Sequence, residues 1–189
     1  MNFKEINPII IGMCGAKQSG KNAVGHLLLL GLPKIPFMQE AFANPIKEDV
    51  ADAFGISKVD IEQRKNDPIV RRVLQHYGTE WGRQERGENV WVDRMGYKID
   101  GIPKDKRTLV IITDVRFKNE AEFISSRGGC VVTIERPFKD RAAQMDSHDS
   151  EQEWYKISPD FRIVNDGSML DLERNVKWLA RDIKERYGI

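Results

Sequence analysis

A glycine-bounded loop near the N-terminus stands between an apolar run and a segment with helical spacing. The apolar run reads Pro8-Ile-Ile-Ile-Gly-Met-Cys14, and its β-branched composition is typical of a strand buried on both faces of a parallel sheet. The loop reads Gly15-Ala-Lys-Gln-Ser-Gly20-Lys21, and residues 22–30 can follow as a helix. This order predicts an α/β fold, because a parallel sheet needs helices to cover its faces.

The loop matches the pattern G-x-x-x-x-G-K, which in this strand-to-helix context indicates a phosphate-binding loop, or P-loop. Glycines let successive backbone N–H groups point at phosphates, and the helix adds its positive N-terminal end. We therefore expect the phosphates of a nucleotide to bind the loop residues Gly15, Ala16, Lys17, Gln18, Ser19, Gly20, Lys21 and Asn22. Lys21 would bridge the β- and γ-phosphates. The alternative is an ordinary strand–turn–helix connection with a surface lysine.

Two residues are candidates for a magnesium site. The position after Lys21 usually carries a Ser or Thr that ligates Mg²⁺, but here it is Asn22, whose amide oxygen can ligate a hard cation or bond to its water shell. Asp114 ends a second buried run, Leu109-Val-Ile-Ile-Thr-Asp114. The carboxyl ends of parallel strands gather at one sheet edge, so Asp114 is expected beside the loop as a catalytic or metal-binding carboxylate. The alternative is that Asp114 caps the turn before Phe117.

The remaining pattern alternates strands and helices and predicts a three-layer α/β/α domain that spans residues 1–189. Further strands are expected at residues 37–43, 130–135 and 161–165. Further helices are expected at residues 46–54, 67–84, 89–99 and 117–126, and after Ser168. Gly78 allows a break or kink inside the helix at 67–84.

Composition excludes several classes of function. The chain has 30 basic and 29 acidic residues, a net charge of +1, which argues against a polybasic nucleic-acid binder. No apolar stretch approaches the roughly 20 residues that span a bilayer, and no signal peptide is visible. Cys14 and Cys130 are too few for a disulfide framework or zinc site and fit buried positions in a reducing cytosol. We therefore expect a cytoplasmic protein that acts on small molecules, not on nucleic acid or membranes.

Six segments in order carry a resemblance to a known family. They are Gly15 to Lys21, Phe42-Ala-Asn-Pro-Ile-Lys47, Tyr77-Gly-Thr-Glu-Trp-Gly-Arg83, Asp114-Val-Arg-Phe-Lys-Asn-Glu-Ala-Glu122, His148-Asp-Ser-Glu151 and Val164-Asn-Asp-Gly-Ser168. Together they resemble the bacteriophage-type deoxynucleoside monophosphate kinases, a branch of the P-loop kinases. The resemblance implies transfer of the γ-phosphoryl group of ATP to a deoxynucleoside 5′-monophosphate, with Mg²⁺, in the host cytoplasm if the chain is phage-encoded. It leaves a homodimer open. Members usually carry Asp-Thr where this chain has Asn22-Ala23.

The region at about residues 38–101 is expected to bind the acceptor. A second phosphate needs its own cations, for which Lys47, Arg83 and Arg116 are candidates; the alternative for each is a solvated charge on a helix face. Trp91 is the preferred platform for the acceptor base and Phe42 a further lining residue, with Trp81 assigned to packing.

Two further segments are expected to close the site. A lid at about residues 136–150 would bring Arg136 and Arg141, with Lys139, onto the migrating phosphoryl group; the alternative is a solvated linker. His148 is interpreted as structural. Asn165 and Gly167 resemble the place where P-loop kinases hold the donor adenine, and the alternative is a plain turn before Ser168.

Two other functions remain open on sequence grounds. A kinase related to the dephospho-coenzyme A kinases would share the Asn-Asp-Gly-Ser ending, but those enzymes lack the Gly-Thr-Glu-Trp-Gly-Arg segment. A non-catalytic nucleotide-binding protein is supported only by Asn22-Ala23.

Overall fold

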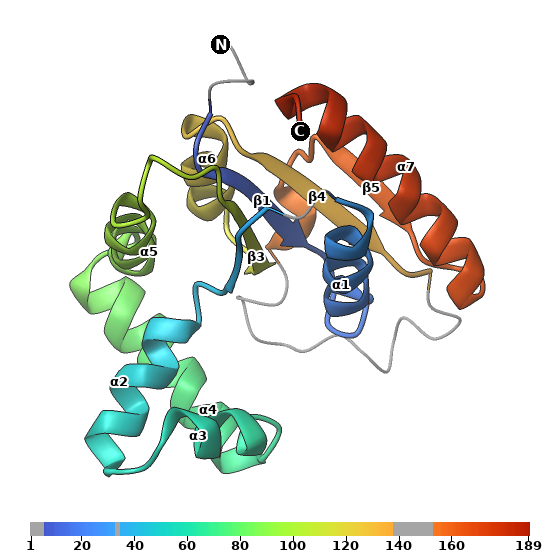
Figure 1. Ribbon diagram of the computed structural model, residues 1–189. Helices are drawn as coiled ribbons and strands as arrows, with labels where there is room; N and C mark the ends of the chain where they lie inside the picture. The colour runs from blue at the N-terminus through green and yellow to red at the C-terminus, as the bar shows by residue number, and fades with distance from the viewer. Residues whose placement is uncertain (1–5, 33–34, 138–152) are drawn as a thin grey trace. The chain divides into compact units, whose positions relative to one another are not determined.

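The computed structural model describes residues 6–32, 35–137 and 153–189, and the chain forms two compact units (Figure 1). Unit 1 comprises Met1–Glu40 and Ile102–Ile189, and unit 2 comprises Ala41–Gly101. Most of the region expected to bind the acceptor thus folds as a unit with its own core.

Unit 1 is built on a five-stranded sheet whose strands are all parallel. The strands are β1 (Ile9–Cys14), β2 (Phe37–Glu40), β3 (Leu109–Val115), β4 (Cys130–Glu135) and β5 (Phe161–Val164), in the order β2-β3-β1-β4-β5. Every residue of β1 is buried, as its apolar composition predicts. Strands β2 and β3 lie on one side of β1, and β4 and β5 lie on the other. The strand order therefore reverses at β1, and α/β sheets bind ligands at such a switch point.

Helices cover both faces of this sheet and give the predicted three layers. Helices α1 (Lys21–Gly31) and α7 (Met169–Tyr187) pack on one face, and α6 (Lys118–Ser126) lies on the other (Figure 1). The apolar stripe expected on the last helix is buried: Leu172, Val176, Leu179 and Ile183. On the opposite face, a Cβ at Gly12 would lie 2.4 Å from Ile124, so glycine lets α6 approach β1 closely.

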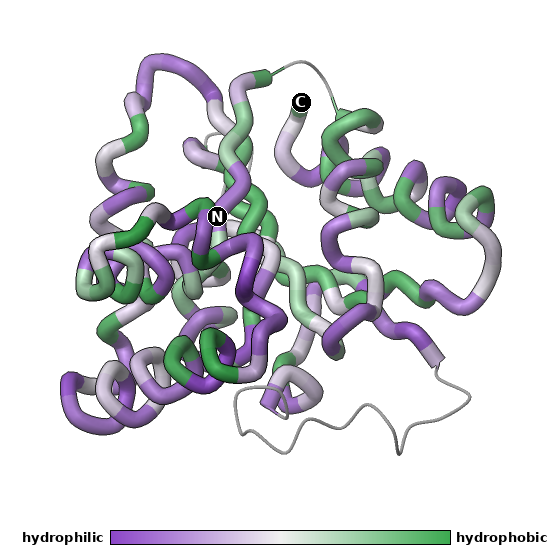
Figure 2. The backbone as a smooth tube through the Cα atoms, turned by 90° about the horizontal axis from the view of Figure 1, so that it is seen from below, coloured by the Kyte–Doolittle hydropathy of each residue, from purple (hydrophilic) through white to green (hydrophobic). Residues whose placement is uncertain are grey.

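Unit 2 is helical, and hydrophilic residues alternate with hydrophobic ones along its helices (Figure 2). The elements are α2 (Asn44–Phe54), α3 (Lys58–Arg64), α4 (Pro68–His76), the π-helix η2 (Tyr77–Arg86) and α5 (Val90–Asp100). A small core centres on Val50, Ala51 and Ile61, with partly buried apolar residues of α4 packed against it.

Several predicted elements differ from the observed ones. The expected strand at 37–43 ends at Glu40, and the helix expected at 67–84 changes from α to π geometry at Tyr77, next to Gly78. Helix α3 is absent from the sequence prediction. It begins at a capping box in which Ser57 Oγ accepts from the Asp60 amide and Asp60 accepts from the Ser57 amide, each at 3.1 Å. A short 3₁₀ helix, Trp154–Lys156, is also additional.

Two composition-based expectations can be compared with the structure. Both cysteines are free and buried. None of the helices in the described residues is both long enough and apolar enough to cross a bilayer.

Candidate active site

The glycine loop curls between the end of β1 and the start of α1. Its backbone adopts positive φ angles at Gly15 (139°), Gln18 (63°) and Gly20 (104°). A Cβ at Gly15 would lie 2.3 Å from the carbonyl oxygen of Ile134, and one at Gly20 would lie 2.5 Å from Asn165. Both glycines are therefore required by conformation and by space. Gln18 is the one non-glycine residue with positive φ in the described part of the chain, and such strained backbone clusters at functional sites.

Lys21 folds back over the loop that precedes it. Its Nζ atom donates to the carbonyl oxygens of Gly15 and Ala16, both at 2.8 Å, and its side chain is half-buried. These bonds hold the ammonium group at the loop before any phosphate arrives. Because α1 starts at this residue, the positive end of the helix and the lysine charge act at the same place.

The floor under the loop is a buried pair of small polar side chains. Cys14 Sγ lies 2.9 Å from Thr133 Oγ1 across β1 and β4. Burial raises the pKa of the Cys14 thiol above its usual value, and the bond to Thr133 only partly opposes this. The thiol is therefore protonated near neutral pH and acts as packing.

Asn165 supports the loop from the end of β5. Its Nδ2 group donates to the carbonyl oxygen of Ser19 at 2.9 Å, and its backbone N–H donates to Glu135 at 2.7 Å. This tie between β5 and the loop is a structural role that the sequence did not indicate. Gly167 is exposed, and a Cβ there would lie 2.8 Å from Asp171, the capping partner of Ser168.

Asp114 lies at the same sheet edge as the loop. It precedes Val115, which is the register partner of Cys14, the last residue of β1. Asp114 is half-buried, and Asn22 is exposed on the first turn of α1. A carboxylate and an amide oxygen are suitable ligands for a hard cation. Mg²⁺ in proteins is usually held by one or two such side chains and keeps water and phosphate oxygens as its other ligands, and the chemistry of Asp114 and Asn22 fits that pattern.

The turn after β3 is fixed by Glu120, which sequence reasoning did not single out. Its buried carboxylate accepts from the backbone N–H groups of Arg116 at 2.8 Å and Phe117 at 3.2 Å. Glu120 is the third residue of α6, so it caps that helix while it positions Arg116 near the end of β3. Glu120 lies in the segment from Asp114 to Glu122 that carries the family resemblance, and this was the signal in the sequence that could have identified it.

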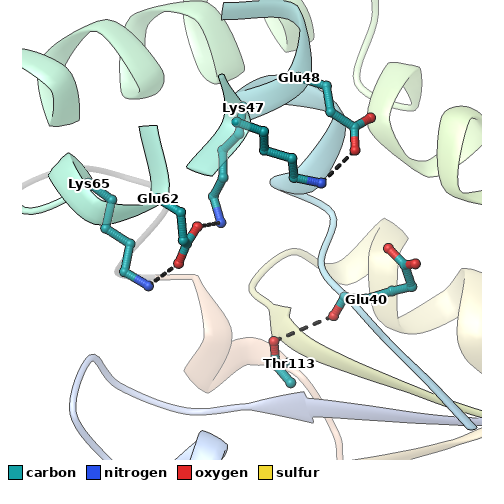
Figure 3. Close-up of polar contacts among 7 residues, drawn as sticks. Glu40, Lys47, Glu48, Glu62, Lys65 and Thr113 are labelled. Carbon is teal, nitrogen blue, oxygen red and sulfur yellow. Dashed lines mark hydrogen bonds and ion pairs between the residues drawn. The ribbon is translucent and has the colours of Figure 1, made fainter. Parts of the chain in front are cut away.

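Lys47 is engaged in an ion-pair chain within unit 2. Its Nζ lies 2.6 Å from Glu62, which also pairs with Lys65, while Lys58 and Glu48 form a second pair at 2.5 Å (Figure 3). Partial burial raises the pKa of Glu62, but its bonds to Lys47 and Lys65 outweigh this and leave the pKa below its usual value. These pairs tie α2 to α3. In unit 1, Thr113 on β3 donates to the carbonyl oxygen of Glu40 at the end of β2, at 3.4 Å (Figure 3).

Three other expected acceptor residues also lie in unit 2. Arg83 donates to the carbonyl oxygen of Glu88 at 3.0 Å. Phe42 is 3% exposed and Trp91 is 1% exposed, and the Trp91 indole N–H donates to the carbonyl oxygen of Gly78 at 2.8 Å. A base has no access to Trp91 in this conformation, so the structure argues against Trp91 as a stacking platform and gives it a packing role.

The half-buried Trp81 belongs to a stack on the π-helix. Its ring lies on that of Tyr77, with centroids 4.3 Å apart and an interplanar angle of 25°. The Arg86 guanidinium lies 4.8 Å from the Trp81 centroid. Tyr77 OH donates to Asp49 at 3.2 Å, and Arg94 donates to the same carboxylate at 2.5 Å. The sequence pattern gave no signal for this arrangement.

The expected lid is described only at its start. Arg136 is exposed after β4, whereas Arg141, Lys139 and His148 lie outside the described residues. The expected site residues therefore divide between the units: the loop, Asp114, Arg116, Arg136, Asn165 and Gly167 in unit 1, and Phe42, Lys47, Arg83 and Trp91 in unit 2.

Comparison with known proteins places the chain in a family. Residues 55–176 match the family described as "Deoxynucleotide monophosphate kinase". A protein of Acanthamoeba polyphaga mimivirus named "Putative deoxynucleotide monophosphate kinase" is 32% identical over 177 residues, which cover 83% of this chain and 88% of that protein. The chain belongs to the deoxynucleotide monophosphate kinase family. The family match includes both the π-helix and the segment from Asp114 to Glu122.

A second member of the deoxynucleotide monophosphate kinase family matches a smaller part of the chain. The "Deoxynucleoside-5′-monophosphate kinase" of Escherichia phage T5 is 36% identical over 92 residues, which cover 47% of this chain and 32% of that protein. Among solved structures, a shikimate kinase from Aquifex aeolicus matches 94% of this chain and 97% of that chain, with a TM-score of 0.47 and 18% identity. A gluconokinase from Sinorhizobium meliloti matches 96% of each chain, with a TM-score of 0.47 and 13% identity.

Proposed function

We propose that this protein transfers the γ-phosphoryl group of ATP to the 5′-phosphate of a deoxynucleoside monophosphate, which yields ADP and a deoxynucleoside diphosphate. The observation that carries this proposal is the family match, because the mimivirus relative is aligned over 88% of its length. The loop at the carboxyl edge of the sheet supports the donor half of the reaction. We also propose that the protein acts in the cytoplasm on small molecules rather than on nucleic acid.

The donor triphosphate binds along the loop from Gly15 to Asn22. Backbone N–H groups of the loop and the N-terminal end of α1 receive the phosphate oxygens. Lys21 leaves its two loop carbonyls for the β- and γ-phosphates and stabilises charge on the moving group, because a charged donor gains more there than at a carbonyl. Asn165 and Gly167 flank the adenine end.

Asn22 and Asp114 would hold the Mg²⁺ ion of the nucleotide. When bound, the ion would neutralise charge on the phosphates and supply electrostatic stabilisation of the transferring group. Asp114 would bind the ion or its water shell from β3, and the amide of Asn22 would take the role of the usual hydroxyl. Tyrosine, histidine or another general base is not needed, because the attacking group is already a phosphate oxygen.

The acceptor phosphate needs cations of its own, and Arg116, Arg83 and Lys47 are the proposed ones. Arg116 is favoured among them, because Glu120 positions its backbone next to Asp114. Lys47 must exchange or share its bond to Glu62 in order to bind a phosphate. Arg136 and Arg141 complete the charge neutralisation when the proposed lid closes, and closure excludes water as a competing acceptor.

The test is an assay of ADP formation with a panel of acceptors at fixed MgATP. Deoxynucleoside monophosphates should be turned over, with kcat/KM above that of the matching ribonucleotides. A ribose hydroxyl left unpaired in the acceptor pocket would cost about 1–3 kcal/mol in activation free energy. Equal kcat/KM for dGMP and GMP, and for dTMP and UMP, would contradict the deoxyribose preference. Preference for dephospho-coenzyme A, or ATP binding without any turnover, would contradict the reaction itself.

A further inference from the structure

A cavity lies beside the π-helix, wholly within unit 2. It has a volume of about 510 Å³ and is lined by residues at the end of η2 and the first turns of α5, among them Arg86, Asn89, Asp93, Arg94 and Tyr97. Pockets of about 300–1,000 Å³ are typical of small-molecule sites, and a nucleoside fits within that range. Tyr97 is 81% exposed, so an aromatic ring stands on the rim of the cavity without being packed in the core.

The guanidinium group of Arg86 forms one wall of this cavity, and neighbouring aromatic rings support it. Arg86 lies over Trp81 at 4.8 Å, and Trp81 lies on Tyr77 at 4.3 Å. Tyr77, Trp81 and Arg86 are spaced by four and five residues. The i→i+5 bonding of a π-helix places residues five apart about one turn from each other, so the helix itself aligns the three groups.

The far end of the stack is anchored through Asp49. This carboxylate accepts from Tyr77 OH and from Arg94. Burial first, and then the Asp49 charge and its hydrogen bond, raise the pKa of Tyr77, so the phenol keeps its proton and remains a donor. Arg94 also lines the cavity, so the anchor and the pocket wall share a residue. Trp81 and Tyr77 therefore support the position of the Arg86 guanidinium from behind.

We propose that this cavity binds the base of the deoxynucleotide acceptor, stacked on the outer face of the Arg86 guanidinium. The assignment rests on the proposed function and names the residues of its acceptor-base subsite. Guanidinium planes stack on nucleobases as aromatic rings do, and Trp81 already occupies the inner face of Arg86.

The charges around the cavity favour a base over a phosphate. The lining contains two guanidinium groups, Arg86 and Arg94, and two carboxylates, Glu88 and Asp93. A nearly balanced lining suits a neutral ring whose edge carries both donors and acceptors. The side-chain amide of Asn89, in the same lining, can both donate and accept hydrogen bonds. The acceptor phosphate is left to the cations named above.

The experiment compares two fragments of the acceptor as competitive inhibitors of the intact enzyme. A deoxynucleoside carries the base without the phosphate, and deoxyribose 5-phosphate carries the phosphate without the base. The variants are Arg86→Ala and Trp81→Leu. The matched controls are Arg181→Ala and Trp178→Leu, since Arg181 lies 4.2 Å over the exposed Trp178 on α7 and forms the same kind of pair in unit 1. Melting curves and ATP binding check that each variant is folded.

Arg86→Ala should raise the inhibition constant of the deoxynucleoside and the KM for the deoxynucleotide roughly tenfold, the range of one base-stacking contact. Trp81→Leu should act in the same direction with a smaller effect, and kcat and the constant for deoxyribose 5-phosphate should stay within twofold. The inference is overturned if only deoxyribose 5-phosphate weakens, which makes Arg86 a phosphate ligand, if both fragments weaken equally, which indicates a general disturbance of the site, or if neither changes. A wild-type protein that phosphorylates no deoxynucleotide would instead remove the proposed function.

Discussion

The positive charge of Lys21 is concentrated on its Nζ atom, at the loop that is proposed to bind the donor phosphates. Its ammonium group is held by two carbonyl oxygens of the loop, and we expect Lys21→Ala to remain folded. Lys21→Ala should lower kcat about 10²- to 10³-fold, as removal of one transition-state donor does elsewhere. Steady-state kinetics with a melting curve provide the measurement. Lys177→Ala, an exposed lysine of α7 paired with Glu173, is the matched control. Wild-type turnover in Lys21→Ala would exclude the loop as the donor site.

Asn22 is the residue at which this chain departs from the usual phosphate loop. A serine there would restore the hydroxyl ligand that is usual at this position at the start of α1. We expect Asn22→Ser to reduce the magnesium concentration required for half-maximal activity, with ATP binding unchanged. Magnesium titrations of both proteins give the answer. An unchanged or higher requirement in the serine variant would indicate that the amide already ligates the ion.

The two tryptophans near the acceptor region show where single residues escape prediction. Trp81 lies between Glu80 and Gly82, whereas Trp91 lies between Val90 and Val92, and these apolar neighbours were the available signal that Trp91 is the packing ring. The difference arises from two glycines. Gly82 leaves space for the Trp91 ring, and the carbonyl oxygen of Gly78 accepts from the Trp91 indole N–H. By contrast, the conformation at Gly15, Gly20 and Lys21 is local, and the sequence pattern was sufficient to predict it.

At the level of elements, the π-helix depends on close packing against α5. A Cβ at Gly82 would lie 2.5–2.8 Å from three atoms of the buried Trp91 indole, which has no room to retreat. Gly82→Ala should therefore lower the free energy of unfolding by about 1–3 kcal/mol, as overpacking does in other cores. Gly101→Ala is the control, since its Cβ would meet only ordinary contacts at 3.5 Å or more. Denaturant titration of both variants measures the difference, and equal stabilities would contradict the packing account.

The link between α2 and α3 should respond to acid. The folded-state pKa of Glu62 is below its usual value of 4.5, so its contribution to stability is present above that pH. It is lost as the pH falls through the folded-state value, because the unfolded chain then binds the proton more readily. In Glu62→Gln, the free energy of unfolding should therefore fall less steeply as the pH decreases below about 4.5. Urea titrations across this range test it, with Glu122→Gln, an exposed pair with Lys118 on α6, as control. Identical pH profiles for the two variants would contradict the account.

Elements with a dense local signal were predictable, and those set by neighbours were not. Strands β1, β3 and β4 are continuous apolar runs, and Asp67 caps α4 as its sequence indicates, accepting from the Ile69 amide at 2.9 Å. Helix α3 has only seven residues, too few for an apolar period to emerge, although its Ser57–Asp60 capping box was available as a signal. The change to π geometry at Tyr77 reflects packing against Trp91, which no periodicity in the segment encodes.

For the whole molecule, the residues with proposed roles in the reaction divide between the two units. The α/β unit holds the proposed phosphate loop, the magnesium candidates and the start of the proposed lid, whereas the helical unit holds the stack, the cavity and the remaining acceptor candidates. The parallel sheet and the place of the loop followed from sequence patterns, because a parallel sheet collects the carboxyl ends of its strands at one edge, whereas the order of the strands came from the structure. Which side chains of the helical unit are accessible depended on packing between helices, and only the structure supplied it.

The central claim is that the loop delivers a phosphoryl group to the 5′-phosphate of a deoxynucleotide. The most direct measurement incubates the protein with ATP radiolabelled in its γ-phosphate and each deoxynucleoside monophosphate, and separates the products by chromatography. Label should appear in a deoxynucleoside diphosphate with the wild-type protein and with Lys177→Ala, and should be strongly reduced with Lys21→Ala. Label that stays in ATP, or appears only as inorganic phosphate with every acceptor, would contradict the account.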